Sequence, residues 1–238
     1  MRNFLKIAVI AVAVAAASSD AFAQFGVNIG YMTSNTRPAL AGIDAHNSRT
    51  NGFTVGIDSE LKLIGNFLSI QPGLYYQHLL ASEDIAEIAG LAARNTYSDF
   101  FLAVPIHFKL GFNIIPDRML RLYVFAGPTF EIGLKSADKI SLSGRDISGE
   151  VSYNYYTGAF KTSSTELDNL VASYFPEGEK LYGRFDVMLG GGIGLQVIKF
   201  LDIKVGYDYG MIDRYRTDVE GRQPANRGQF YVGVGIRI

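Results

Sequence analysis

The chain has 238 residues, enough for a single barrel or for two small domains. Its 22 Lys and Arg residues balance its 23 Asp and Glu residues, so no basic field is available to attract nucleic acid, and we expect no nucleic-acid partner. The absence of Cys excludes a disulfide framework, a thiol nucleophile and a cysteine-linked lipid anchor. With only three His, we expect neither a metal site nor another cofactor.

Residues 1–23 have the three parts of a secretory signal. Basic Arg2 and Lys6 precede an apolar run over Ile7–Ala17, and a small-x-small sequence follows. The apolar run is shorter than the ~20 residues that a membrane-spanning helix needs, which argues against a retained anchor. We therefore predict cleavage after this segment and one mature domain over residues 24–238.

Downstream of the signal, apolar side chains alternate with other residues in eight segments of about the length that a tilted strand needs to cross a bilayer, ~9–11 residues. The segments run over Phe25–Tyr31, Phe53–Leu63, Leu68–Tyr76, Phe100–Leu110, Leu120–Leu134, Phe185–Val197, Leu201–Met211 and Phe230–Ile238. The connections alternate between long ones (Ser34–Thr50, Ala81–Thr96, Ser136–Leu181, Ile212–Arg227) and short ones (Ile64–Phe67, Asn113–Met119, Lys199–Phe200). This pattern predicts an all-β fold, an eight-stranded antiparallel up-and-down transmembrane β-barrel with long extracellular loops in an outer membrane.

The positions opposite the apolar ones carry the charges of these segments. The cations there are Lys62, Lys109, Arg121, Lys135, Arg184, Lys204 and Arg237, and the anions are Asp58, Glu60, Asp99, Glu131, Asp186, Asp202 and Asp208. A charge facing lipid costs ~2–4 kcal/mol at the midplane of such barrels, so the uncharged face is expected to meet hydrocarbon and the charged face to line the lumen. Eight strands enclose a lumen that side chains fill, which favours a plugged charge network that includes His107 over a conducting path.

Several local features follow from the same pattern. Aromatic residues beside the short turns predict an interfacial girdle (Phe67, Phe112, Phe200). Prolines inside three strands predict β-bulges (Pro72, Pro105, Pro128). The third long connection is expected to extend its two strands above the membrane around Ile140–Tyr156 and to hold a short helix near Ser164–Tyr174, and the second is expected to hold a helix at Glu83–Arg94.

Catalytic or ligand-binding motifs are scarce. His78 projects from the apolar face near the outer rim, close to where Ser98 is expected. This pair could act as base and nucleophile in acyl transfer on lipid. A headgroup contact is the simpler interpretation, because no third orienting group is evident. His46 lies in the first long connection without a metal-ligand partner at useful spacing. The glycine run at Gly190–Gly194 lies inside a strand and is not followed by a helix, so it is not expected to bind phosphate.

The same segments resemble the PorT-like outer-membrane β-barrel proteins of Bacteroidetes over nearly the whole mature chain. The residues that carry this resemblance are Gln71–Tyr75, Val104–Ile106, Tyr123–Pro128, Gly190–Gly194 and Tyr207–Gly210. The chain departs from the family at Ala103, where members often have Glu, and at Ile238, where an aromatic residue is usual. The resemblance implies an outer-membrane barrel but no catalytic residues, and one branch of the family serves protein secretion.

The leading functional interpretation is a non-enzymatic barrel, surrounded by outer-membrane lipid, whose extracellular loops contact a protein partner, a ligand or a surface. A lipid A-modifying enzyme, and a narrow transporter or secretion-system subunit, remain as alternatives. A periplasmic lipocalin-like barrel would need apolar residues inside, opposite to the observed pattern.

Overall fold

The computed structural model describes residues 23–35, 49–88, 91–115, 119–144, 147–164, 178–216 and 226–238. The expected signal segment up to residue 22, the loop residue His46 and most of the expected helix near Ser164–Tyr174 lie outside these residues. Within them, no helix is long and apolar enough to cross a bilayer.

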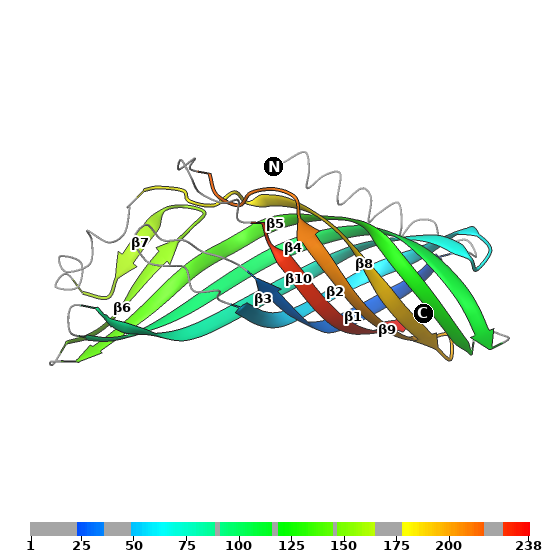
Figure 1. The fold of residues 1–238 in the computed structure, drawn as a ribbon, viewed down its shortest axis with the longest axis horizontal. Coiled ribbons are helices and arrows are strands. Elements are labelled where there is room, and N and C mark those ends of the chain that lie inside the picture. Colours follow the sequence, from blue (N-terminus) through cyan, green and yellow to red (C-terminus); the bar gives the residue numbers. More distant parts are fainter. Residues whose placement is uncertain are drawn as a thin grey trace.

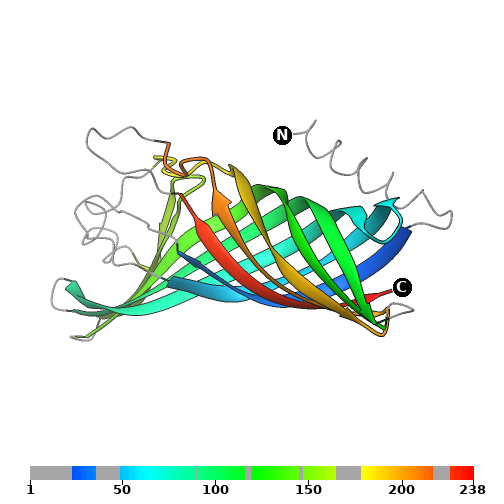
Figure 2. The ribbon, with the colours of Figure 1, turned by 45° about the vertical axis from the view of Figure 1, so that its right-hand side comes forward.

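Eight strands form a closed antiparallel ring, which confirms the predicted fold class. In ring order they are β1 (Ala23–Asn35), β2 (Arg49–Ile64), β3 (Leu68–Ile88), β4 (Leu91–Ile115), β5 (Leu120–Gly144), β8 (Phe185–Val197), β9 (Leu201–Gly210) and β10 (Gly228–Arg237). Pairing of β4 with β5 and of β1 with β10 completes the barrel, seen from two sides in Figures 1 and 2.

The two faces of the barrel wall differ as the alternation predicts. Outward side chains are exposed and apolar, as at Val27, Ile29 and Val234. Inward side chains are polar and buried, as at Asn28 and Arg237. An apolar surface of this kind on a closed barrel suits contact with hydrocarbon, because the ring leaves no unpaired strand edge within the wall.

The ends of the barrel are unlike one another, and we call them the turn end and the loop end. At the turn end, short connections join β2 to β3, β4 to β5 and β8 to β9, and the C-terminus lies there too (Figure 1). The expected girdle residues Phe67, Phe112 and Phe200 are about half exposed at this end, and the rings of the first two meet edge to face at 5.4 Å.

At the loop end, the wall continues beyond the barrel as a projecting sheet, which we call the extension. It consists of the ends of β3, β4 and β5 together with β6 (Ile147–Asn154) and β7 (Ala159–Thr162). The predicted strand extension around Ile140–Tyr156 is confirmed by the pairing of β5 with β6. The helix predicted at Glu83–Arg94 is wrong: the described residues of this segment lie in β3 and β4, because the pairing of these two strands continues there and overrides the local helical preference.

The prediction of bulges at the three strand prolines is also wrong. The register is the same on both sides of each proline, although neighbouring pairs such as Ser59 with Pro72 and Ile106 with Pro128 are missing from the ladder. Proline removes a hydrogen-bond donor but inserts no residue, so the ladder is interrupted without being shifted. Register shifts occur elsewhere, one of them where Phe100 and Phe101 of β4 face Lys135 and Gly133 of β5.

Candidate functional site

The barrel lumen is the first candidate site, and at the turn end a compact ion cluster fills it. The carboxylate of Glu60 accepts hydrogen bonds from Lys109 Nζ at 2.8 Å and from Arg121 Nη1 at 2.7 Å. All three side chains are almost completely buried. The second guanidinium nitrogen of Arg121 donates to the carbonyl of Asn66 in the short β2–β3 connection, so this cluster ties the turn to the lumen.

A second cluster lies directly above the first. Arg237 Nη1 donates to Asp58 Oδ1 at 3.1 Å, and Arg237 Nη2 donates to Asp202 Oδ2 at 2.7 Å, which joins β10 to β2 and β9. Lys204 Nζ lies 3.7 Å from Asp58 Oδ2. Buried tyrosine hydroxyls complete the set, because Tyr75 donates to Asp58 at 2.6 Å and Tyr123 donates to Asp202 at 2.7 Å.

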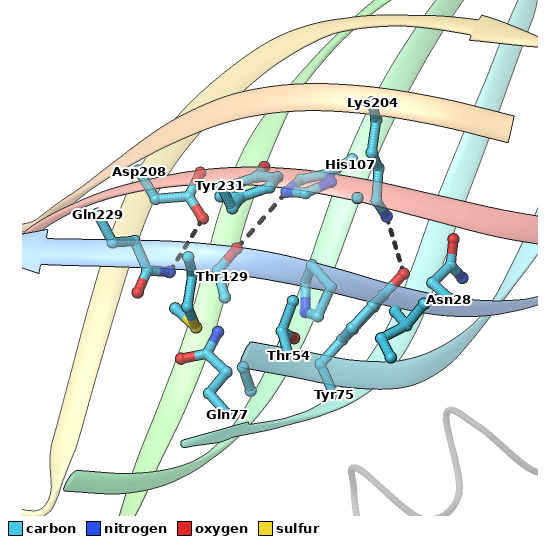
Figure 3. Close-up of a pocket in the computed structure, with 15 residues that line it drawn as sticks. Asn28, Thr54, Tyr75, Gln77, His107, Thr129, Lys204, Asp208, Gln229 and Tyr231 are labelled. Atoms are coloured by element: carbon cyan, nitrogen blue, oxygen red, sulfur yellow. Dashed lines mark hydrogen bonds between the residues drawn. The ribbon is translucent and has the colours of Figure 1, made fainter. Parts of the chain in front are cut away.

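Midway along the lumen, a cavity of about 50 Å³ separates the two halves of the network (Figure 3). The expected residue His107 lines it, with its Nε2 3.5 Å from the hydroxyl oxygen of Thr129. Lys204 and Asp208 line it from the opposite wall. A space of this size holds a few water molecules at most, so it does not amount to a conducting path.

Toward the loop end, buried ion pairs close the lumen again. Arg214 Nη1 donates to Asp99 Oδ2 at 3.2 Å, and Arg227 pairs with Glu131 and lies 3.9 Å above the ring of Phe101. These two arginines escaped the sequence analysis because they lie in a long connection, beyond the last alternating residue of the adjacent strands. No periodic signal points to them.

Other inward polar residues could have been found from the sequence. Tyr75, Tyr123 and Gln229 share the parity of the predicted lumen charges, and Gln229 donates to Glu131 at 3.3 Å and to Asp208 at 3.4 Å. Their polarity and their parity along the strands are the signals that assign them to the lumen. The lumen network therefore contains more neutral polar partners than the predicted charges alone.

The remaining predicted network residues lie nearer the barrel ends or outside. Asp186 is buried, and its carboxylate accepts from the backbone N–H of Ile212 at 3.3 Å. Arg184 is partly buried, and its guanidinium lies 5.1 Å from the ring of Tyr156; Lys62 is partly buried near the turn end. The prediction that Lys135 points inward is wrong, because the register shift beside Phe100 turns it to the outer surface.

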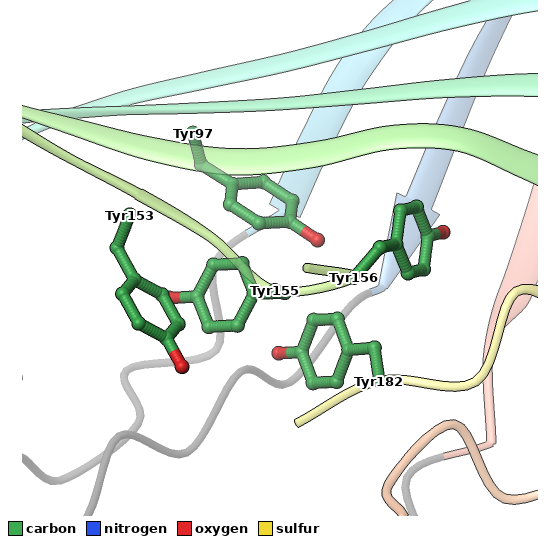
Figure 4. Close-up of a cluster of buried hydrophobic side chains, with 5 residues drawn as sticks. All are labelled: Tyr97, Tyr153, Tyr155, Tyr156 and Tyr182. Carbon is green, nitrogen blue, oxygen red and sulfur yellow. The ribbon is translucent and has the colours of Figure 1, made fainter. Parts of the chain in front are cut away.

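Above the lumen, five buried tyrosines form a second candidate site, which we call the tyrosine cluster: Tyr97, Tyr153, Tyr155, Tyr156 and Tyr182 (Figure 4). The rings of Tyr155 and Tyr182 stack with centroids 4.5 Å apart. The hydroxyl of Tyr155 donates to Asp138 in the extension, where burial raises the pKa of that carboxyl to about 6. The cluster thus gives the extension a packed core and one carboxyl group that titrates near neutral pH.

The pair His78 and Ser98 is not assembled for acyl transfer. The Ser98 hydroxyl donates to the carbonyl of Ala137 at 3.4 Å, and the His78 ring stacks on Phe100 with centroids 4.1 Å apart. Both side chains lie on the outward face near the loop end, but they belong to neighbouring rather than directly opposed register positions. Among the described residues, no group of three or more His, Asp or Glu side chains could hold a metal ion.

Comparisons with known proteins give similar solved structures and one matching family model. Solved structures similar to the chain include the attachment invasion locus protein Ail of Yersinia pestis in complex with the heparin analogue sucrose octasulfate (14% identity, 92% of this chain and 100% of that chain covered, TM-score 0.43). They also include Neisserial surface protein A (10%, 91% and 97%, TM-score 0.37) and the outer membrane protease OmpT of Escherichia coli (8%, 92% and 97%, TM-score 0.32). No curated protein sequence matches the chain. The family model described as "Outer membrane protein beta-barrel domain" matches residues 16–216, so the chain belongs to the family of outer-membrane β-barrel domain proteins.

Proposed function

We propose that this protein is a non-enzymatic outer-membrane barrel that holds the extension at the cell surface, where it binds a partner protein, a ligand or a surface. In this proposal the segment up to residue 23 is a cleaved export signal. We further propose that the chain is a PorT-like outer-membrane β-barrel protein of Bacteroidetes, a family that its strand motifs resemble.

The proposal rests on one observation, which is that three strands of the wall continue beyond the barrel rim. β3, β4 and β5 have 21, 25 and 25 residues, about twice the ~9–11 residues that a tilted strand needs to cross a bilayer, or more. Their outer ends pack around the tyrosine cluster. An ordered sheet held this way offers a partner a preformed surface, which lowers the entropy lost on binding.

The lumen supports the same proposal by contrast. Its ion clusters are buried and mutually paired at both ends, which favours a structural plug over a transport route. Liposomes that contain the purified protein should therefore show no conductance above that of protein-free liposomes. Stepwise channel currents would contradict a plugged lumen and favour the transporter alternative.

Site-specific photo-crosslinking in intact outer membranes tests the binding role. A photoreactive residue at exposed Ser141 of the extension should give a discrete adduct, whereas the same residue at outward-facing Leu122 in the barrel wall should give lipid adducts only. Heat-modifiable gel mobility verifies that both photoreactive variants are folded as barrels. Adducts limited to lipid and insertion machinery from Ser141 would refute the proposal.

An enzymatic role is tested separately through Ser98. The proposal expects Ser98→Ala to leave the lipid A profile of the cell unchanged. A changed profile would favour the lipid-modifying alternative.

A further inference from the structure

Lys135 is the charged side chain that the β-bulge in β5 turns outward. Below it, the outward positions of β5 are all apolar from Leu122 to Leu134. Above it, the residues of β5 that face water are polar, beginning with Lys139. Lys135 therefore marks the height at which the apolar belt gives way to the polar extension, which corresponds to the membrane interface on this side of the barrel.

Two exposed cations at the neighbouring ends of β4 and β5 have partners within the extension. Lys139 Nζ lies 2.7 Å from Glu150 Oε1, and Arg94 Nε lies 3.3 Å from Asp84 Oδ1. Lys135 forms no ion pair with any residue in the described part of the chain. Its ammonium group is thus available to an external anion.

An aromatic shelf lies beside Lys135 on the outer surface. The Lys135 ammonium lies 5.8 Å from the ring centre of Phe100, His78 stacks on that ring at 4.1 Å, and Phe53 meets the His78 ring edge to face at 5.5 Å. The His78 Nε2 is buried among these rings and has no hydrogen-bond partner among the described residues. The shelf spans β2 to β5 and presents the Lys135 ammonium group beside flat apolar ring surfaces.

This arrangement matches the two parts of a phosphorylated lipid. Acyl chains can lie against the rings of Phe53 and Phe100, while the phosphate meets the ammonium group at the headgroup level. A lysine facing lipid costs ~2–4 kcal/mol at the bilayer midplane but only ~0–1 kcal/mol near the interface, where its apolar stem can extend toward the headgroups. The bulge thereby turns the Lys135 side chain outward at the headgroup level and not within the hydrocarbon.

We propose that Lys135 binds a headgroup phosphate of a lipid A molecule in the outer leaflet, while the rings of His78 and Phe100 pack against the acyl chains of that lipid. Ser98 lies next to Lys135 on the outward surface, where its hydroxyl can add a contact to the headgroup. The outward face around His78 and Ser98 would then bind lipid without catalysing a reaction. It acts independently of any partner bound by the extension.

The test measures lipid retained by the purified barrel after detergent exchange, by native mass spectrometry. Wild type, Lys135→Gln, Lys135→Arg and the matched control Lys139→Gln are compared with diphosphorylated lipid A and with enzymatically dephosphorylated lipid A. One cation near a membrane surface contributes about 1 kcal/mol, so Lys135→Gln should retain about fivefold less of the phosphorylated lipid. Lys135→Arg and Lys139→Gln should retain it like wild type, and heat-modifiable mobility verifies that each variant is folded.

Three outcomes would overturn the proposal. Equal retention by Lys135→Gln and wild type would show that the cation does not bind the headgroup. Equal retention of phosphorylated and dephosphorylated lipid A by wild type would exclude phosphate recognition. Binding of inorganic phosphate alone to wild type but not to Lys135→Gln, with equal lipid retention by the two proteins, would indicate a site for free phosphate instead of a lipid headgroup.

Discussion

Arg237 offers the sharpest test of how the lumen network stabilises the barrel. Its guanidinium makes two contacts to Asp202 Oδ2, at 3.1 and 2.7 Å, and one to Asp58 Oδ1 at 3.1 Å. Removal of the side chain in Arg237→Ala leaves two carboxylates in the lumen. Asp58 keeps Lys204 at 3.7 Å, but the only direct partner that Asp202 keeps among the described residues is the Tyr123 hydroxyl, so Asp202 becomes the less compensated charge.

The expected loss follows from this imbalance. Removing one partner of a buried ion pair costs roughly 3–5 kcal/mol, because the other charge stays buried without compensation. Neutralising the stranded group in the double variant Arg237→Ala with Asp202→Asn should therefore recover a substantial part of that loss, with a coupling free energy of about 1–3 kcal/mol between the two positions.

Urea unfolding in detergent micelles, followed by the gel mobility shift, measures these free energies. Arg94→Ala serves as the matched control, since the side chains of Arg94 and its partner Asp84 are 65% and 81% exposed and such pairs contribute ~1 kcal/mol or less. If Arg237→Ala costs no more than Arg94→Ala, or if Asp202→Asn deepens the loss, the view that buried pairing stabilises the lumen is wrong.

Three further predictions concern the extension and the turns. Burial raises the pKa of Asp138 to about 6, so this carboxyl group stays protonated in the folded state at pH values at which the unfolded chain, with a pKa near 4, is already ionised. The stability of the extension should therefore fall by up to ~3 kcal/mol between pH 4 and 6. Asp138→Asn should abolish this fall, measured as the urea midpoint read by tyrosine fluorescence. Gly133→Ala would place a methyl group against Tyr156 of the tyrosine cluster and should cost about 1–3 kcal/mol in the same assay, whereas Gly183→Ala, whose new methyl group would meet only the Arg214 carbonyl oxygen at 3.7 Å, should cost less than ~1 kcal/mol. Ile198 and Lys199 have φ of 51° and 69° in the three-residue connection between β8 and β9, a backbone region that Asn and Gly adopt more readily. The double replacement by Asn and Gly should therefore raise the urea midpoint, and a lower midpoint would contradict strain there.

The sequence predicted most of the barrel because its wall obeys a single rule. Alternation separates the face that meets hydrocarbon from the face that lines the lumen, and it correctly predicts that Glu60, Lys109 and Arg121 point to the same interior. The rule fails where its period is broken. One extra residue at the bulge was enough to turn Lys135 to the outside, and no feature of the one-dimensional pattern marks that insertion.

Features that depend on contacts between distant segments were beyond the pattern. Arg214 and Arg227 enter the lumen from a connection whose path is set by their ion pairs with Asp99 and Glu131, not by periodicity. The segment Glu83–Arg94 has helical spacing but is held as a strand hairpin by its neighbours. In the first case no local sequence signal indicates the tertiary contacts, and in the second the tertiary contacts override the local signal.

The seam between β1 and β10 has a consequence for how the molecule assembles. There Val27 pairs with Ile236, so the ring can close only after more than two hundred intervening residues have been arranged. Contacts so distant along the chain form slowly, and an unclosed precursor would present two unsaturated strand edges to the lipid. Insertion should thus be committed in a late, concerted step, and a host factor that shields those two edges would accelerate it.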